Sequence, residues 1–132
     1  MILVDTNVIV DVLKADPQWL AWSSVQLREA RLKGPLFINV MVYAELAAHP
    51  GVERRVDAFL HDQGFRLRDL STDCARLAAQ AFRLYRQRRG AKTGVLPDFF
   101  IGAQAQAEGW PLLTRDASRY RSYFPGLELI CP

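Results

Sequence analysis

Short apolar runs alternate along this chain with longer segments whose apolar residues recur every three or four positions. The first run, Ile2-Leu3-Val4, stops abruptly at Asp5, and a second run covers residues 36–40. Runs this short and this apolar are typical of buried strands, and the segments between them are typical of amphipathic helices. A chain that alternates strand and helix in this way favours an α/β domain with a central, mainly parallel sheet.

The alternation predicts strands over residues 2–4, 36–40, 65–70, 111–114 and 127–130. Helices are expected over residues 6–13, 17–33, 41–48, 52–63, 71–89, 97–108 and 117–123, with a loop over 90–96. Thr6 or Asn7 is expected to cap the first helix, and Pro17 to open the second.

The length of 132 residues fits one domain spanning residues 1–132. No apolar run approaches the roughly 18 residues that a membrane-spanning helix needs. The first residues also lack the basic start and long apolar stretch of a signal peptide. We therefore expect a cytoplasmic protein with no membrane segment.

Four acidic residues stand near element boundaries that this architecture brings to one edge of the sheet. Asp5 and Asp116 follow the strands at residues 2–4 and 111–114. Glu45 and Asp98 lie in helices, and parallel α/β sheets bind ligands beyond the carboxyl ends of their strands. Mg²⁺ and Mn²⁺ prefer oxygen ligands, and such a cation polarises a phosphoryl oxygen and activates a water.

Each of these acids also has an ordinary structural explanation. Asp5 can cap the helix that follows it, Asp98 can complement a helix dipole, and Asp116 can occupy a turn. Glu45 is harder to explain in this way, because its neighbours over residues 43–47 are mostly apolar. Spacing alone leaves both interpretations open, since the four acids are far apart in the sequence.

Four segments carry a more specific pattern: ILVDTNVIVD at residues 2–11, NVMVYAEL at 39–46, LPDFFIGAQA at 96–105 and LLTRD at 112–116. In this order, and over nearly the whole chain, they resemble the PIN-domain ribonucleases. Within that family they are similar to the VapC-like toxins of type II toxin–antitoxin systems. The opening Asp-Thr-Asn alone is a weak signal, whereas the four segments together are specific.

The resemblance implies a three-layer α/β/α fold and metal-dependent endoribonuclease activity. Position by position, the resemblance implies that the family's acidic quartet corresponds to Asp5, Glu45, Asp98 and Asp116. It implies that the supporting polar residues are Thr6, Asn7 and Thr114. It also implies Mg²⁺ or Mn²⁺ as the cofactor and transfer or ribosomal RNA as the substrate. The implied partners are a small antitoxin that blocks the acidic pocket and a second copy of the chain in a homodimer.

Arginine supplies fourteen of the seventeen basic residues, and its planar guanidinium matches phosphate oxygens. Basic residues crowd the end of the helix at 71–89, and Arg115, Arg119 and Arg121 surround Asp116. The sequence therefore predicts RNA contacts from Arg88, Arg89, Lys92 and Arg115. Alternatively, the helix-end group is solvated and complements the helix dipole, and Arg115 holds an acid in place.

Two other functions remain open from the residues alone. One is a phosphatase with Asp5 as its nucleophile, although Asn7 stands where such sites place a second aspartate. The other is a PIN-like module that binds RNA or protein without cleaving. Asp11 is a further acid that we expect away from the metal, at the surface or in an ion pair.

Overall fold

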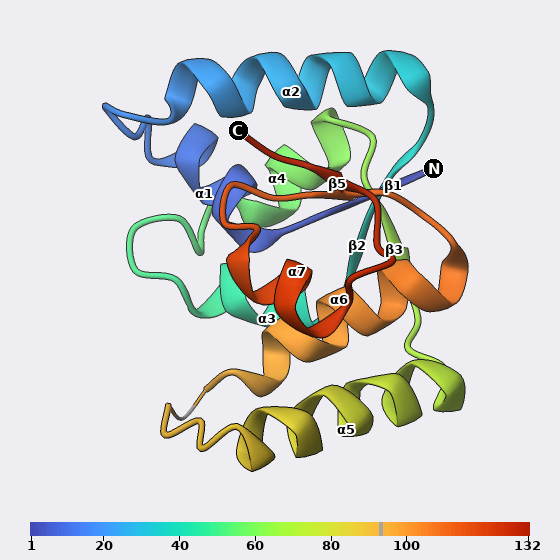
Figure 1. Cartoon of the computed structure of the whole chain (residues 1–132). Helices are drawn as coiled ribbons and strands as arrows, with labels where there is room; N and C mark the ends of the chain where they lie inside the picture. The colour runs from blue at the N-terminus through green and yellow to red at the C-terminus, as the bar shows by residue number, and fades with distance from the viewer. Residues whose placement is uncertain (93) are drawn as a thin grey trace.

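The computed structural model describes residues 1–92 and 94–132 and contains a five-stranded sheet (Figure 1). The strands are β1 (Ile2–Val4), β2 (Leu36–Asn39), β3 (Arg66–Arg68), β4 (Leu112–Leu113) and β5 (Leu129–Ile130). Their order is β3-β2-β1-β4-β5, and every neighbouring pair is parallel. The chain builds outward from β1 in both directions, so the carboxyl end of β1 is the switch point at which such sheets bind ligands.

The helices of the described residues are α1 (Thr6–Leu13), α2 (Leu20–Lys33), α3 (Val40–Ala48), α4 (Val56–Asp62), α5 (Thr72–Gln87), α6 (Leu96–Glu108) and α7 (Ser118–Tyr123). Figure 1 shows α2 along one side of the sheet and α6 along the other, with α5 outside α6. The predicted arrangement of a parallel sheet between helices is confirmed. Within the described part of the chain, every helix is too short or too polar to cross a membrane.

The hydrophobic core includes the central strand β1 and its neighbours β2 and β4, all of which are buried. Leu3, Val4, Leu112 and Leu113 are completely buried, as their short and wholly apolar runs predict. The edge strand β3 differs, because all three of its residues are exposed. The strand in which charged and apolar residues alternate is therefore the one that faces water along one edge of the sheet.

Several predicted boundaries were wrong by a few residues, and local hydrogen bonds explain the clearest case. The second helix begins at Leu20 and not at Pro17. The Asp16 carboxylate accepts hydrogen bonds from the backbone N–H groups of Gln18 at 2.8 Å and Trp19 at 2.9 Å. The Asp16 side chain therefore holds residues 16–19 in a turn, and α2 begins only after this turn.

Of the N-caps that the sequence offered for the first helix, the structure selects Asp5. Asp5, and not Thr6 or Asn7, caps α1, because its carboxylate accepts from the Thr6 backbone N–H at 2.7 Å. The helix predicted over residues 71–89 also ends earlier than expected. It corresponds to α5, which ends at Gln87, and Arg89 adopts a positive φ of 58°. The loop expected over residues 90–96 includes position 93, which lies outside the described residues.

A close approach between α6 and α7 depends on Gly102. A Cβ atom at this position would lie 2.6 Å from the Phe124 ring and 3.1 Å from the Tyr120 ring. Both rings are buried, so neither can move aside without disturbing the core. The absent side chain therefore lets α7 pack directly on α6.

We predict that Gly102→Ala lowers the free energy of unfolding by about 1–3 kcal/mol, because the added methyl overpacks a buried contact. Gly126→Ala is the matched control, since a Cβ there meets nothing within 4 Å. Urea denaturation of both variants measures the difference. Equal stability of Gly102→Ala and the wild type would contradict the proposed close packing.

Candidate active site

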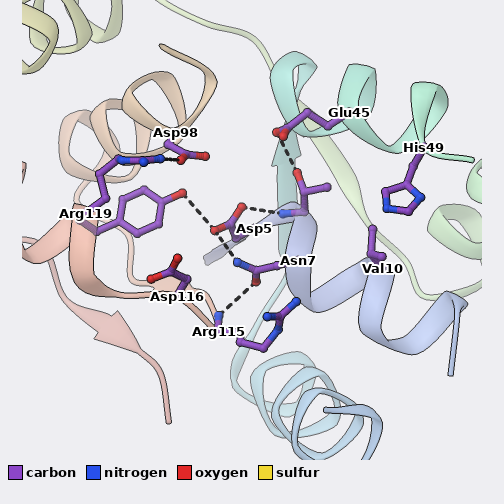
Figure 2. Close-up of a pocket in the computed structure, with 11 residues that line it drawn as sticks. Asp5, Asn7, Val10, Glu45, His49, Asp98, Arg115, Asp116 and Arg119 are labelled. Atoms are coloured by element: carbon purple, nitrogen blue, oxygen red, sulfur yellow. Dashed lines mark hydrogen bonds and ion pairs between the residues drawn. The ribbon is translucent and has the colours of Figure 1, made fainter. Parts of the chain in front are cut away.

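All four candidate acids lie around one pocket of about 280 Å³ (Figure 2). Asp5 follows β1, Asp116 follows β4, Glu45 lies on α3 and Asp98 lies in the first turn of α6. The parallel sheet brings these residues together, since β1 and β4 are neighbours that end at the same edge. The lining residues are Asp5, Thr6, Asn7, Val10, Glu45, His49, Asp98, Arg115, Asp116, Arg119 and Tyr120.

Asp5 is the most constrained of the four acids. Besides capping α1, its Oδ2 atom accepts hydrogen bonds from Thr114 Oγ1 at 2.8 Å and Tyr120 Oη at 3.0 Å. Asn7 Nδ2 donates to the same oxygen at 3.2 Å. Burial raises the pKa of the Asp5 carboxyl to about 6, the hydrogen bond from Thr114 opposes this shift, and the charge of Asp98 adds to it.

Glu45 lines the pocket from α3, the helix that begins directly after β2. Asn39 caps this helix, with its side-chain oxygen accepting from the backbone N–H groups of Met41 and Val42, both at 3.0 Å. Thr6 Oγ1 donates to Glu45 Oε1 at 2.9 Å. Burial raises the pKa of Glu45 above its ordinary value, and the hydrogen bond from Thr6 opposes the shift.

Asp98 forms an ion pair with Arg119, whose Nη1 atom contacts Asp98 Oδ2 (Figure 2). Burial raises the pKa of Asp98, and the neighbouring guanidinium counteracts part of that rise. Asp116 is more exposed and accepts from the backbone N–H of Ser118 at 3.4 Å. The four acids therefore have very different surroundings within one pocket.

Arg115 holds an acid in place, as one of the two interpretations of the sequence proposed. Its Nε atom lies 2.9 Å from Asp11 Oδ2, and its guanidinium carbon lies 5.4 Å from the centre of the Trp19 ring. Ser23 Oγ donates to the same Asp11 oxygen at 2.8 Å. Asp11 is buried in this ion pair and is not at the surface, and it is not among the described residues that line the pocket.

The supporting polar residues form one network behind the acids. Asn7 Oδ1 accepts from the Arg115 backbone N–H at 3.1 Å, while Asn7 Nδ2 also donates to Thr114 Oγ1 at 3.3 Å. Thr114 Oγ1 in turn accepts from the Asp116 backbone N–H at 3.2 Å. Asn7 and Thr114 therefore fix the segment that carries Asp116 against the start of α1.

Four lining residues received no site role from the sequence: Val10, His49, Arg119 and Tyr120. His49 lies four residues after Glu45, and that spacing, which places residues on one helix face, was an available signal. Arg119 and Tyr120 follow Asp116 at about one helical turn, but their partners Asp98 and Asp5 are distant in sequence. Only the packing of α7 on α6 reveals these contacts.

The basic residues predicted at the end of α5 lie outside this pocket. Arg88, Arg89 and Lys92 are absent from its described lining. Arg88 lies over the Tyr123 ring at 5.1 Å from its centre and donates to the Ser122 carbonyl at 3.3 Å. The Lys92 backbone N–H donates a hydrogen bond to the Tyr85 hydroxyl at 2.8 Å.

The donor set of the pocket suits a hard divalent cation. Four carboxylates supply oxygen ligands, and burial raises the pKa of three of them, so negative charge in this pocket is costly until a cation offsets it. In residues 1–92 and 94–132, no three His, Cys, Asp or Glu side chains meet closely enough to hold one ion. Mg²⁺ usually keeps several waters and takes one or two carboxylates, so this arrangement fits an ion held partly through water.

Fold and pocket together define a parallel α/β domain with an acidic site at the switch point of its sheet. A model of the PIN-domain family matches residues 2–124. The VapC ribonuclease Mb2780c of Mycobacterium bovis is 31% identical over 86% of this chain and 88% of that protein. The VapC ribonuclease Y4jK of Sinorhizobium fredii is 32% identical over 100% of this chain and 97% of that protein. The chain belongs to the PIN-domain family.

Solved structures agree with this fold. VapBC2 from Rickettsia felis, bound to a DNA fragment from its promoter, superposes with a TM-score of 0.77 at 21% identity, covering 100% of this chain and 99% of that chain. VapBC-1 from nontypeable Haemophilus influenzae gives a TM-score of 0.72 at 16% identity, covering 99% of this chain and 98% of that chain. At these identities the likeness establishes the arrangement of helices and strands.

The raised pKa of Asp5 predicts that the metal-free protein becomes less stable as the pH rises through about 6. In the unfolded chain the pKa of Asp5 returns to the ordinary aspartate value of 3.8, so between pH 3.8 and about 6 the folded state binds more protons. The protonated carboxyl favours folding fully below about pH 4, and this contribution of about 2–3 kcal/mol is lost as Asp5 ionises.

Thermal melting in EDTA across this pH range measures the effect. Asp5→Asn keeps an oxygen to cap α1, and its neutral amide removes the titration, so the melting temperature of this variant should depend less on pH. Identical pH profiles for the variant and the wild type would show that Asp5 ionises normally.

Proposed function

We propose that the chain is a metal-dependent endoribonuclease that acts as one PIN domain over residues 1–132. The observation that carries this proposal is the convergence of four carboxylates from four elements on one pocket. The names of its VapC ribonuclease relatives support RNA cleavage as the activity. We infer transfer or ribosomal RNA as the substrate, cleaved in the cytoplasm.

In this proposal Asp5, Glu45, Asp98 and Asp116 hold Mg²⁺ or Mn²⁺ directly or through water. When bound, the cation supplies Lewis-acid polarisation of the scissile phosphate and lowers the pKa of an attacking water. Thr114 and Tyr120 orient the Asp5 carboxylate by donating to Oδ2. Thr6 orients Glu45, and Asn7 supports the segment that presents Asp116.

The environment of Asp5 argues against the phosphatase alternative. A nucleophilic carboxylate must present a free oxygen to the phosphorus atom. Here Oδ1 accepts from the Thr6 backbone, and Oδ2 accepts from Asn7, Thr114 and Tyr120. Oδ1, with one donor, keeps an open position that a small cation or its water can use, whereas the burial of the side chain hinders the approach of a phosphoryl group to either oxygen.

We also propose that the chain is the toxin of a toxin–antitoxin pair. The matching solved structures are VapBC assemblies, which supports a small cognate antitoxin as the protein partner. From the family resemblance we also infer that two copies of the chain form a homodimer. Co-purification with the product of an adjacent reading frame, followed by light scattering, tests both expectations together.

We predict that the partner-free chain cleaves total RNA into discrete fragments with Mg²⁺ or Mn²⁺ and leaves it intact in EDTA. Asp98→Asn and Glu45→Gln should each reduce the cleavage rate about 100-fold or more, because each removes a charged ligand from the pocket. Gel analysis with end-mapping of the fragments measures both effects.

Asp73→Asn is the matched control for this experiment. Asp73 is an exposed acid on α5 that pairs with Arg76, so its loss should leave cleavage unchanged. Wild-type cleavage by Asp98→Asn and Glu45→Gln would contradict the assignment of the acids. Retained RNA binding without cleavage in any metal would instead identify a binding-only module.

We further propose that Arg88, Arg89 and Lys92 bind phosphates that flank the cleavage site. This group follows α5 and precedes α6, whose first turn carries Asp98. Arg88→Ala with Arg89→Ala should weaken RNA binding and reduce the slope of log affinity against log salt by about 1–1.5, the value for two lost phosphate contacts on single-stranded RNA.

Fluorescence anisotropy at several salt concentrations measures this slope. Arg66→Ala with Arg76→Ala removes the same charge from two exposed arginines outside the pocket and serves as the control. An equal change of slope in both double variants would assign the effect to net charge and show that Arg88 and Arg89 do not contact the RNA.

A further inference from the structure

The ion pair between Arg119 and Asp98 places a cation of the chain itself in the acidic pocket. Arg119 lies near the start of α7, and its guanidinium contacts Asp98 in the first turn of α6. The two side chains are 27% and 32% exposed, so the pair is partly shielded from water and remains accessible from the pocket.

This pairing is selective within the described residues. Asp5 is held by neutral donors, including Thr114 and Tyr120, and Glu45 accepts from the hydroxyl of Thr6. Asp98 is the acid of the quartet that has a cationic partner in residues 1–92 and 94–132. The guanidinium therefore occupies a carboxylate oxygen that a divalent cation would need.

A second arginine on the same pocket provides a contrast. Arg115 is fixed, because it pairs with the buried Asp11 and lies over Trp19. Breaking that pair would leave a buried carboxylate uncompensated, which is strongly unfavourable. Arg119 can leave its partner more easily, because Asp98 is partly exposed and water or a cation can replace the guanidinium there.

We propose that Arg119 exchanges between two partners: it neutralises Asp98 in the metal-free protein and binds a phosphate of the RNA substrate when a divalent cation takes Asp98. A guanidinium and a divalent cation repel each other and compete for the same oxygen, so both cannot remain on it. A phosphate brought to these acids offers the displaced guanidinium two oxygens in the fork geometry that it prefers. The phosphate half of this proposal depends on the proposed nuclease function.

Calorimetric titration of the metal-free chain with Mn²⁺ tests the exchange without any RNA. At a pH well above 6, Arg119→Gln should bind Mn²⁺ about three- to tenfold more tightly than the wild type, because the competing guanidinium is gone. Arg119→Lys should lie between the two, since lysine keeps the charge and loses the fork. Melting curves in EDTA verify that each variant is folded.

Arg76→Gln is the control, because it also removes an arginine from an Arg–Asp pair, but on the outer helix α5. It should leave the Mn²⁺ affinity unchanged. An unchanged or weaker affinity in Arg119→Gln, or an equal gain in Arg76→Gln, would overturn the exchange.

Cleavage of total RNA at saturating Mn²⁺ tests the phosphate half. Arg119→Gln should slow cleavage about tenfold or more although it binds the metal more tightly, because the transition state loses a charged phosphate contact. Tighter metal binding with an unchanged cleavage rate would overturn the phosphate role. Failure of the wild type to cleave would refute the proposed function, whereas the calorimetry would still decide the exchange.

Discussion

The Asp5 carboxylate is buried at the carboxyl end of the central strand, where removing a charge from water costs several kcal/mol. Four donors offset part of that cost: the Thr6 backbone and the side chains of Asn7, Thr114 and Tyr120. These donors come from α1, the end of β4 and α7, so one carboxylate joins three separate segments. The positions of the remaining pocket residues depend on this junction.

The packing of the helices and the chemistry of the pocket are therefore coupled. Gly102 lets α7 approach α6, and this approach brings Tyr120 to Asp5 and Arg119 to Asp98. The hydrogen bonds to Asp5 do not fully offset its burial, however, because burial still raises the pKa of this carboxyl. A site that leaves its carboxylates under-compensated favours the binding of a cation, which is what the proposed nuclease requires.

Much of this organisation could be predicted from the sequence, because it depends on local patterns. The run Ile2-Leu3-Val4 before Asp5 predicted a buried strand with an acid beyond its end, and that strand is the central one of the sheet. The carboxyl ends of parallel strands share one edge, so Asp5 and Asp116 were expected together. Helix starts were less predictable, as Asp16 shows by holding a turn where Pro17 suggested a first helical position.

The partners of the individual charges could not be predicted in the same way. Asp11 was expected at the surface or in an ion pair, and it is buried in an ion pair whose partner, Arg115, lies about one hundred residues later in the chain. Arg119 was visible only as one of several arginines near Asp116. Such contacts depend on how α7 packs on the sheet, which periodicity and spacing do not encode.

In the proposed function, this pocket holds a divalent cation between Asp5 and Asp98 for the cleavage of RNA. Anomalous diffraction from crystals of the partner-free chain soaked in Mn²⁺ tests it most directly. We expect a manganese peak within direct or water-mediated reach of both carboxylates, with the Arg119 side chain turned away from Asp98. Manganese bound only outside the pocket, with the Arg119–Asp98 pair intact, would contradict it.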